Sequence, residues 1–254
     1  MTWLPNSQRG QSGLPGVSPA EWPLQTEPAA HPSAQEGREH AGGTHLYVAR
    51  RCYAAKRAFD IVLASVGVVL WLPVAALIAL AILLDDGWPV FYVQPRVGRG
   101  GRVFLLIKFR SMRRDAEAAT GAVLATVRDP RVTRVGRFLR ATALDELPQL
   151  INILLGHMSF VGPRAERPEF VARFEREIPH YSLRHLIRPG LTGPAQVYGH
   201  YGTTAEEKLR YDLDYIARGS FREDLRLLIR SVLLTLVGRL QERGERFDSK
   251  SFGA

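Results

Sequence analysis

The feature that most constrains this chain is an uninterrupted apolar run at residues 61–84, IVLASVGVVLWLPVAALIALAILL. It carries no charged residue, and a transmembrane helix needs only about 20 apolar residues. A helix buried in the protein core is the alternative. A chain of 254 residues has little material with which to cover a helix that is apolar on every side. The run therefore predicts a membrane helix.

The flanks of this run bear on its topology. Basic residues lie on both sides of it: Arg50, Arg51, Lys56 and Arg57 before, and Arg96, Arg99 and Arg102 after. Positive charge at both ends gives no inside-to-outside bias, and Pro73 removes a hydrogen bond near the middle of the helix. We therefore expect residues 48–86 to form a re-entrant hairpin, helix–break–helix, with both ends in the cytoplasm. A proline-kinked span is the alternative.

Composition narrows the partners of the chain. It has 34 Lys+Arg against 25 Asp+Glu, a formal net charge of +9, and a pI near 10.1. This balance favours an anionic partner, such as nucleic acid, a membrane surface or a phosphorylated substrate. The single cysteine, Cys52, excludes an intrachain disulfide and a cysteine-based metal site. Residues 1–47, rich in Pro, Gly, Ser, Gln and Glu, predict a disordered tail.

Polar side chains suited to phosphate gather after the apolar run. In residues 88–112, two β-rich stretches flank Gly-Arg-Gly-Gly, which predicts a strand, a glycine turn and a second strand. Lys108 and Arg110 then share one face of the second strand, and Gln94 and Arg96 end the first. A solvated polar face of the sheet is the alternative.

More arginines follow along the chain. Four of them recur at every third position: Arg131, Arg134, Arg137 and Arg140. On a helix they spread over about half the circumference, which fits either a helix on an anionic membrane or a solvated basic face. Arg164 and Arg188 each neighbour a Gly-Pro or Pro-Gly turn. Arginines held by rigid turns suit bidentate contacts with phosphate.

Two adjacent carboxylates, Asp145 and Glu146, lie inside the mostly apolar stretch LRATALDELPQLINILLG at residues 139–156. The spacing of the apolar positions predicts a helix, and Pro148 is tolerated only in its first turn, so the helix should begin near Asp145. Taken alone, this stretch favours Asp145 as an N-cap and Glu146 as a partner of the helix dipole.

The last predicted helix combines apolar and basic positions. Leu225, Leu228, Val232 and Leu236 recur at helical spacing, with Arg222, Arg226 and Arg230 elsewhere. We expect it to pack on the domain, with a helix lying at the membrane interface as the alternative.

Together these blocks resemble the bacterial sugar transferases, that is, the monotopic phosphoglycosyl transferases or polyprenyl glycosylphosphotransferases. The resemblance begins at Lys56 and includes KRAFDIVLAS, FYVQPRVGRGGRVFLLIKFRSM, DPRVTRVGRFLRATALDELPQLINILLGHMSFVGPR and RPGLTGPAQVYG, in that order. With it we expect an α+β fold. The re-entrant membrane hairpin would be followed, in residues 87–254, by a small, mostly helical cytoplasmic catalytic domain with a short β-hairpin.

The resemblance implies an activity and its partners. Enzymes of this family move a phosphosugar from a UDP-sugar to a polyprenyl phosphate, usually undecaprenyl phosphate, and release UMP at the cytoplasmic face of the bacterial inner membrane. This step typically initiates a surface glycan of the exopolysaccharide, O-antigen or capsule type. Membrane lipids and a second copy of the chain, in a homodimer, are further expected partners. Nucleic acid is not expected, because the sequence has no helix-turn-helix, zinc or RNA-binding signature.

The resemblance also assigns roles to residues. The adjacent Asp-Glu of the LDELPQ motif is the family's catalytic dyad, so Asp145 is the expected nucleophile and Glu146, beside it, is associated with Mg²⁺. A covalent aspartyl-phosphosugar intermediate predicts ping-pong kinetics. The expected phosphate or nucleotide contacts are Lys108, Arg110, Arg164 and Arg188, with Gln94 and Arg96 in support. The alternative is a non-catalytic membrane scaffold in a glycan assembly complex, which would not need Asp145.

Three positions depart from the family pattern. His157 stands where an acidic residue is common, Ala165 replaces a second proline, and Pro194 replaces a bulkier residue. We expect these changes to affect loop shape and sugar preference. The sequence does not identify the sugar or the final glycan.

Overall fold

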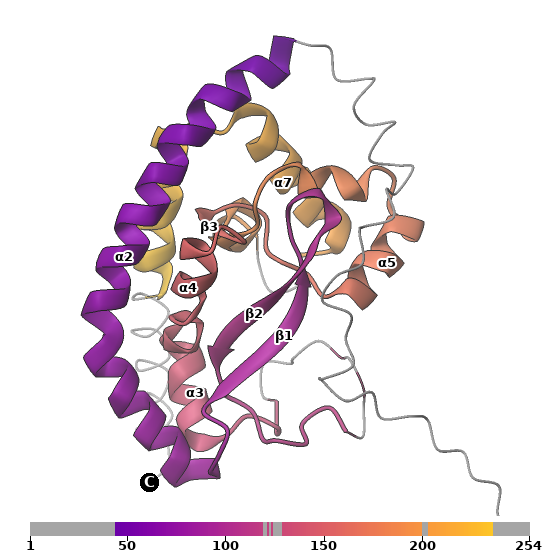
Figure 1. The fold of residues 1–254 in the computed structure, drawn as a ribbon. Coiled ribbons are helices and arrows are strands. Elements are labelled where there is room, and N and C mark those ends of the chain that lie inside the picture. Colours follow the sequence, from indigo (N-terminus) through magenta and orange to yellow (C-terminus); the bar gives the residue numbers. More distant parts are fainter. Residues whose placement is uncertain (1–43, 119–120, 122, 124–128, 200–202, 236–254) are drawn as a thin grey trace, which may run out of the picture.

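The structure is a computed structural model that describes residues 44–118, 121, 123, 129–199 and 203–235. Its helices are α2 (Thr44–Asp86), α3 (Arg134–Ala141), α4 (Gln149–Leu154), α5 (Pro168–Glu177), α6 (Pro194–Val197) and α7 (Ala205–Arg218), and residues 221–235 form a last helix. The strands are β1 (Phe91–Val97), β2 (Val103–Phe109), β3 (Ser159–Val161) and β4 (Gly190–Thr192). Short 3₁₀ turns are η2 (Arg99–Gly101), η3 (Leu144–Glu146) and η4 (Tyr181–Leu186). The predicted α+β class, with a small helical domain and a short β-hairpin, is confirmed (Figure 1).

Helix α2 is the dominant element and carries the apolar run. Its 43 residues continue through Pro73, and the helix curves along one side of the domain (Figure 1). Within the described residues, Ala54–Asp86 is one helix long and apolar enough to cross a membrane. The structure has one continuous helix here and does not show the two separate helices of the expected hairpin. Of the predicted tail, residues 44–47 are the start of α2, and the rest lies outside the described residues.

One face of α2 packs on the domain. Ala64, Trp71 and Ile78 are buried at a spacing of seven residues, which places them on one stripe of the helix. The Trp71 ring meets the Phe109 ring of β2 edge to face, with 5.8 Å between centroids. The opposite stripe is exposed and apolar: Val62, Val66, Val69, Leu70, Leu72, Leu77, Leu80 and Leu84. An unpaired apolar stripe of this length suits contact with lipid.

The part of α2 just before the apolar run is tied to the domain by charged groups. The Lys56 ammonium lies 2.6 Å from the Asp224 carboxylate of the last helix. The Arg57 guanidinium donates to the backbone carbonyls of Ile153 (2.6 Å) and Leu154 (2.9 Å), the last two residues of α4. The carbonyls of the last turn of a helix need partners beyond the helix's own ladder.

The end of α2 is tied to the same domain. Arg110 of the segment after β2 donates to the carbonyl oxygens of Asp86 (2.9 Å) and Gly87 (2.6 Å). The Asp85 carboxylate accepts from the Val135 N–H at 2.9 Å, in the first turn of α3. The Asp85 carboxylate thus pairs a backbone N–H that has no partner within α3. Its negative charge also interacts favourably with the positive end of the α3 dipole. Both ends of the apolar helix are therefore fixed to one domain.

The β-hairpin forms as predicted. β1 and β2 are antiparallel, with Phe91 opposite Phe109 and Val97 opposite Val103. The glycine turn between them uses Gly100 (φ 68°) and Gly101 (φ 75°), a backbone region that favours glycine. The predicted basic helix also forms as α3, but it begins at Arg134 after the N-cap Thr133. Arg131 precedes it and pairs with Asp129 at 2.6 Å.

A buried amide joins the hairpin to α4. Asn152, 1% exposed, accepts from the Ile107 N–H (3.0 Å) and donates to the Leu105 carbonyl (2.7 Å) of β2. Its side chain thus continues the hydrogen bonding of the strand edge, which a buried backbone requires. Because α4 directly follows Asp145 and Glu146, this contact sets the dyad against the hairpin.

We predict that the Lys56–Asp224 pair matters for stability. Lys56→Met would leave the Asp224 carboxylate, 4% exposed, without its cation, and we expect the free energy of unfolding to fall by about 3 kcal/mol. Arg210→Met removes an exposed pair with Glu206 and should cost less than about 0.5 kcal/mol. Chemical denaturation in detergent micelles, followed by circular dichroism, measures both. Equal losses would show that the buried pair has no special role.

Candidate active site

The acidic pair lies on a tight turn and not at a helix start. Ala143 adopts a left-handed conformation (φ 55°, ψ 16°), and Asp145 and Glu146 follow within η3. Helix α4 begins only at Gln149, with Pro148 as its N-cap. The expectation that Asp145 caps a helix was therefore wrong. The left-handed Ala143 turns the chain out of α3, and the dyad is presented between two helices.

Burial dominates the chemistry of Asp145. The residue is 8% exposed. Burial raises the pKa of its carboxyl to about 6, and the neighbouring Glu146 adds to the rise, whereas Lys108 and Arg140 oppose it. The helix N-terminus expected to keep this carboxylate ionised is not beside it. Nearby cations lower the pKa of Asp145 but do not offset the effect of burial.

Glu146 has its own cationic partner. Its carboxylate lies 3.0 Å from the Arg164 guanidinium, with the Glu146 side chain 23% exposed and that of Arg164 46% exposed. Solvent screens this pair, so an incoming anion could exchange with Glu146 as a ligand of Arg164. The structure thus brings the VGPR loop to the dyad, as the sequence predicts.

Lys108 reaches the site from β2. Burial lowers the pKa of its ammonium, and the attraction of Asp145 opposes that shift. Its Nζ lies 5.2 Å from the centroid of the Tyr92 ring, directly across the hairpin in the register Tyr92–Lys108. A cation over an aromatic face is favourably placed, and the contact holds Lys108 on the cavity side of the strand.

Gln94 and Arg96 lie beside these groups on β1. Arg96 donates to the Gln94 side-chain carbonyl (2.8 Å) and to the Ala165 backbone carbonyl (2.9 Å). Burial, with Arg164 nearby, lowers the pKa of Arg96 to about 10. The pair therefore fastens the hairpin to the loop that carries Arg164.

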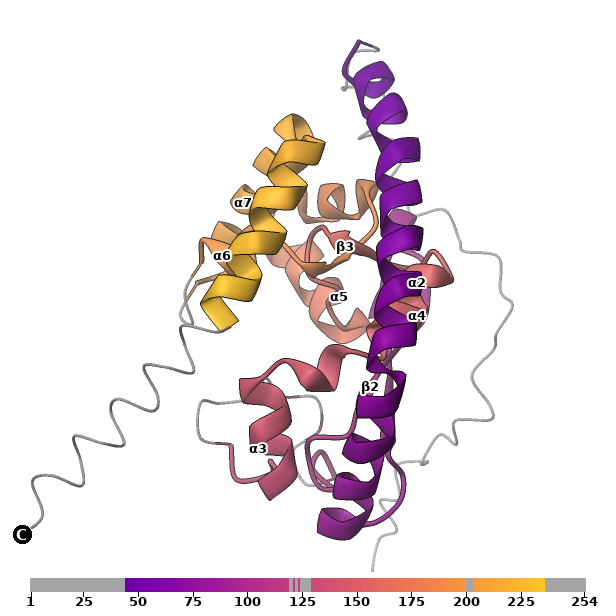
Figure 2. The ribbon, with the colours of Figure 1, turned by 90° about the vertical axis from the view of Figure 1, so that its left-hand side faces the viewer.

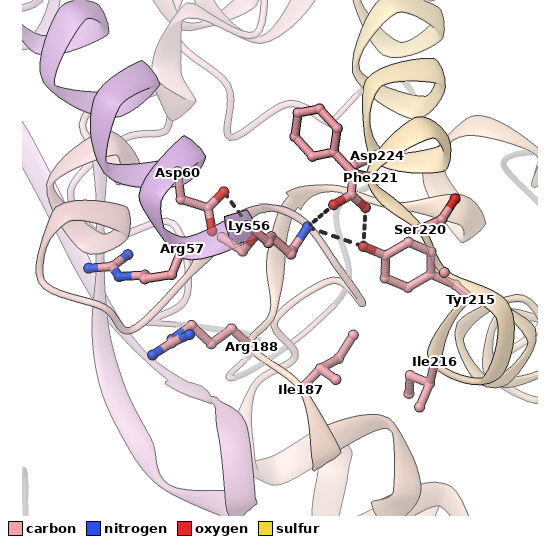
Figure 3. A pocket seen from close by; sticks show the side chains of 12 residues that line it. Lys56, Arg57, Asp60, Ile187, Arg188, Tyr215, Ile216, Ser220, Phe221 and Asp224 are labelled. Carbon is pink, nitrogen blue, oxygen red and sulfur yellow. Dashed lines mark hydrogen bonds and ion pairs between the residues drawn. The ribbon is translucent and has the colours of Figure 1, made fainter. Parts of the chain in front are cut away.

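Two predicted arginines have other environments. Arg110 lines the same cavity, but its guanidinium binds the end of α2. Arg188 does not reach the dyad cavity. It lines a separate small pocket with Arg57 and Asp60, shown in Figure 3, and its Nε donates to the Gly156 carbonyl at 2.8 Å. Phosphate contacts by either residue stay predictions.

A single large cavity of about 1770 Å³ contains the dyad. Its polar wall holds the six residues that the structure brings together: Gln94, Arg96, Lys108, Asp145, Glu146 and Arg164. Leu147, Leu150 and Leu228 belong to an apolar wall of the same cavity. Most pockets for a single small molecule measure about 300–1,000 Å³, so this one has room for more than one ligand.

Asp145 and Glu146 are candidate ligands for a cation. The described residues contain no group of three or more His, Cys, Asp or Glu that could hold a metal ion. Mg²⁺ commonly uses one or two protein carboxylates and completes its shell with water and substrate phosphates. Asp145 and Glu146 supply such a pair, so the donor set fits Mg²⁺ bound together with a phosphate ligand.

Sequence reasoning missed some residues of this site. Tyr92 was not singled out, although pairing the strands around the glycine turn places it opposite Lys108. Arg140 was interpreted only as part of a basic helix, yet it lines the cavity and acts on Asp145. The helical spacing of the arginines did not reveal which one faces the dyad.

The chain was compared with known proteins. A family model described as bacterial sugar transferase matches residues 51–238. Among curated proteins, a UDP-N-acetylgalactosamine-undecaprenyl-phosphate N-acetylgalactosaminephosphotransferase of Aeromonas hydrophila is 41% identical over 186 residues, 72% of this chain and 44% of that protein. A UDP-glucose:undecaprenyl-phosphate glucose-1-phosphate transferase of Xanthomonas campestris pv. campestris is 43% identical over 188 residues, 72% of this chain and 39% of that protein. The exopolysaccharide production protein PSS of Rhizobium leguminosarum bv. phaseoli is 40% identical over 189 residues, 71% of this chain and 94% of that protein. The chain thus spans less than half the length of the first two relatives.

We predict that the turn before the dyad is strained at Ala143. Ala143→Gly should raise the free energy of unfolding by about 0.5–1 kcal/mol, because glycine adopts a positive φ at little cost. The control is Ala141→Gly at the end of α3, which should lower it by about 0.5–1 kcal/mol because that backbone is helical. Thermal unfolding in detergent measures the opposite signs. A loss of stability in both variants would contradict the strained turn.

Proposed function

The chain belongs to the bacterial sugar transferase family, and from this premise we propose that it transfers a sugar 1-phosphate group from a UDP-sugar to undecaprenyl phosphate and releases UMP. The Aeromonas and Xanthomonas relatives carry such activities in their names. The single observation that carries the proposal is the placement of Asp145, buried beside Lys108 and Glu146 in a cavity with one cationic and one apolar wall.

Asp145 is the proposed nucleophile. One of its carboxylate oxygens attacks the phosphorus that bears the sugar, and the bond from that phosphorus to the oxygen of UMP breaks, so UMP leaves with the bridging oxygen. The acyl phosphate that forms retains the sugar and its phosphate. A phosphate oxygen of the lipid then attacks the same phosphorus, and the Asp145 carboxylate leaves. Two displacements at one carboxylate are ordinary covalent catalysis.

Cations of the site make this attack by an anion on an anion feasible. A carboxyl with a pKa of about 6 is mostly ionised at neutral pH. Lys108 and Arg164 reduce the repulsion between that carboxylate and the phosphates, and the interaction of Lys108 is strengthened by its burial. Lys108, fixed over Tyr92, is the group best placed to accompany the transferred phosphate.

Mg²⁺ is part of the proposal. Glu146, with Asp145 beside it, would hold the ion together with phosphate oxygens of the donor. When bound, the metal ion would neutralise part of the negative charge of the phosphates. Arg164 would then release Glu146 and bind a phosphate oxygen in its place.

We also propose that the enzyme is monotopic, on the cytoplasmic face of the inner membrane. The support is that both ends of the apolar helix are tied to one domain, through Lys56 and Arg57 at the start and through Asp85 and Arg110 at the end. A helix that crossed the bilayer would place one end on the far side from that domain. The exposed stripe of α2 would enter the lipid, with Pro73 at the deepest point of a re-entrant path.

The glycan and the sugar are narrower proposals. The Rhizobium relative is named for exopolysaccharide production, and we propose that this chain initiates a surface glycan of that general class. The named relatives use glucose or N-acetylgalactosamine donors, so both UDP-sugars are the first candidates. A homodimer stays a prediction.

Trapping tests the nucleophile. With the UDP-sugar and Mg²⁺ but no lipid acceptor, intact-mass spectrometry should find the mass of one sugar phosphate added, and peptide mapping should place it on Asp145. Asp145→Asn should form no adduct and release UMP at least about a thousandfold more slowly, as loss of a nucleophile does. Asp214→Asn, an exposed aspartate on α7, is the control and should behave as wild type. Unchanged UMP release by Asp145→Asn would favour the scaffold alternative.

Cysteine labelling tests the topology. In a Cys52→Ser background, cysteines replacing Ala55 and Trp88, both exposed, should be shielded from a membrane-impermeant thiol reagent in intact cells and should react after permeabilisation. A cysteine replacing Arg226, on the exposed surface of the domain, marks the cytoplasmic side. Labelling of only one of the two flanking positions in intact cells would establish a span.

A further inference from the structure

The last helix, residues 221–235, has two different faces. Leu227 on one face is fully buried against the domain. On the other, Leu225, Ile229 and Val232 recur at helical spacing and are 46%, 52% and 59% exposed. These three side chains line the same cavity as Asp145. The helix therefore packs on the domain, as expected, while its second face opens into the site.

Helix α2 supplies the facing wall. Phe59, Leu63 and Gly67 line the cavity from α2, and the last helix stands apart from α2 across the domain face in Figure 2. Between them Leu147 and Leu150 line it next to the dyad. We call these residues, with Leu225, Ile229 and Val232, the apolar compartment.

A polar clamp holds the last helix at the root of this compartment. Asp224 accepts from both Lys56 and the Tyr215 hydroxyl, as Figure 3 shows. Next to it the Phe59 and Phe221 rings meet edge to face, with 5.1 Å between centroids. Separating a buried charged pair leaves each charge without its partner, which is costly. Here the Lys56–Asp224 pair fixes the position of the last helix relative to α2.

The charge distribution of the cavity defines its occupant. Lys108, Arg96 and Arg164 line the cavity with the dyad, and the apolar compartment lines the same cavity. A UDP-sugar is polar along its whole length and does not need such a compartment. An amphiphile with a phosphate at one end of a hydrocarbon chain matches both groups of lining residues at once.

We propose that the apolar compartment binds the first isoprene units of the polyprenyl phosphate acceptor, and that residues 221–235 act as an acceptor-chain wall. The inference rests on the proposed function, because it takes the acceptor from it. The hydrocarbon chain of the acceptor then lies in the apolar compartment, and residues 221–235 discriminate between acceptors. The lipid phosphate is thereby delivered to the phosphorus held at Asp145.

Matched valines test the wall by kinetics. Val232→Ser should raise the KM for undecaprenyl phosphate about five- to tenfold, the scale for small changes in an apolar pocket. It should leave the KM for the UDP-sugar donor, which has no hydrocarbon chain, within about twofold. Val69→Ser changes a valine on the outer stripe of α2 that is 72% exposed, against 59% for Val232, and should change neither KM. If Val232→Ser raises the KM of donor and acceptor equally, or behaves as Val69→Ser does, the wall is refuted.

Photolabelling separates this inference from the proposed activity. Asp145→Asn protein in nanodiscs is irradiated with a polyprenyl phosphate that carries a diazirine on an isoprene unit near the phosphate. Adducts should map to residues 225–233 and 59–67, and undecaprenyl phosphate should compete, since binding needs no turnover. Adducts confined to the outer stripe of α2 would overturn the inference even with normal UMP release by wild type. Competed labelling of the compartment in an enzyme that never releases UMP would refute the activity and leave the binding site standing.

Discussion

The attachment of both ends of one apolar helix to one polar domain is the constraint on which the rest of the structure depends. Lys56 and Arg57 hold α2 just before the apolar run, and Arg110 and Asp85 hold its end. These contacts hold both ends of the apolar run against the same polar domain. The apolar stripe between them stays exposed, and the cavity with the acidic pair lies between this helix and the domain.

The site follows from that frame through short connections. Asn152 fastens α4 to β2, and Arg96 fastens β1 to the loop of Arg164. Asp145 is thereby buried between elements that bring cations to it from separate parts of the chain. Its carboxyl is neither free in water nor capping a helix. Its protonation state depends on the balance between burial, which disfavours the ionised form, and nearby positive charge, which favours it.

Much of this arrangement could be predicted from local patterns. The apolar run, the glycine turn between two strands and the dyad each leave a mark within a few residues, and Arg164 was found because its loop is rigid. Arg110 and Arg188 looked equally suited to phosphate, yet one binds the end of α2 and the other lies by a separate pocket. An arginine in a sequence shows its charge but not which carbonyl oxygens will compete for its donors.

The sequence by itself determined the long apolar helix, the α+β class and the position of the acidic pair, because hydrophobic length, backbone turn preference and residue type are local properties. Only the tertiary structure decided that Asp145 follows a left-handed turn, that Tyr92 holds Lys108, and that the last helix faces α2 across one cavity. Those outcomes depend on packing between segments distant in the chain. No pattern within a single segment contains them.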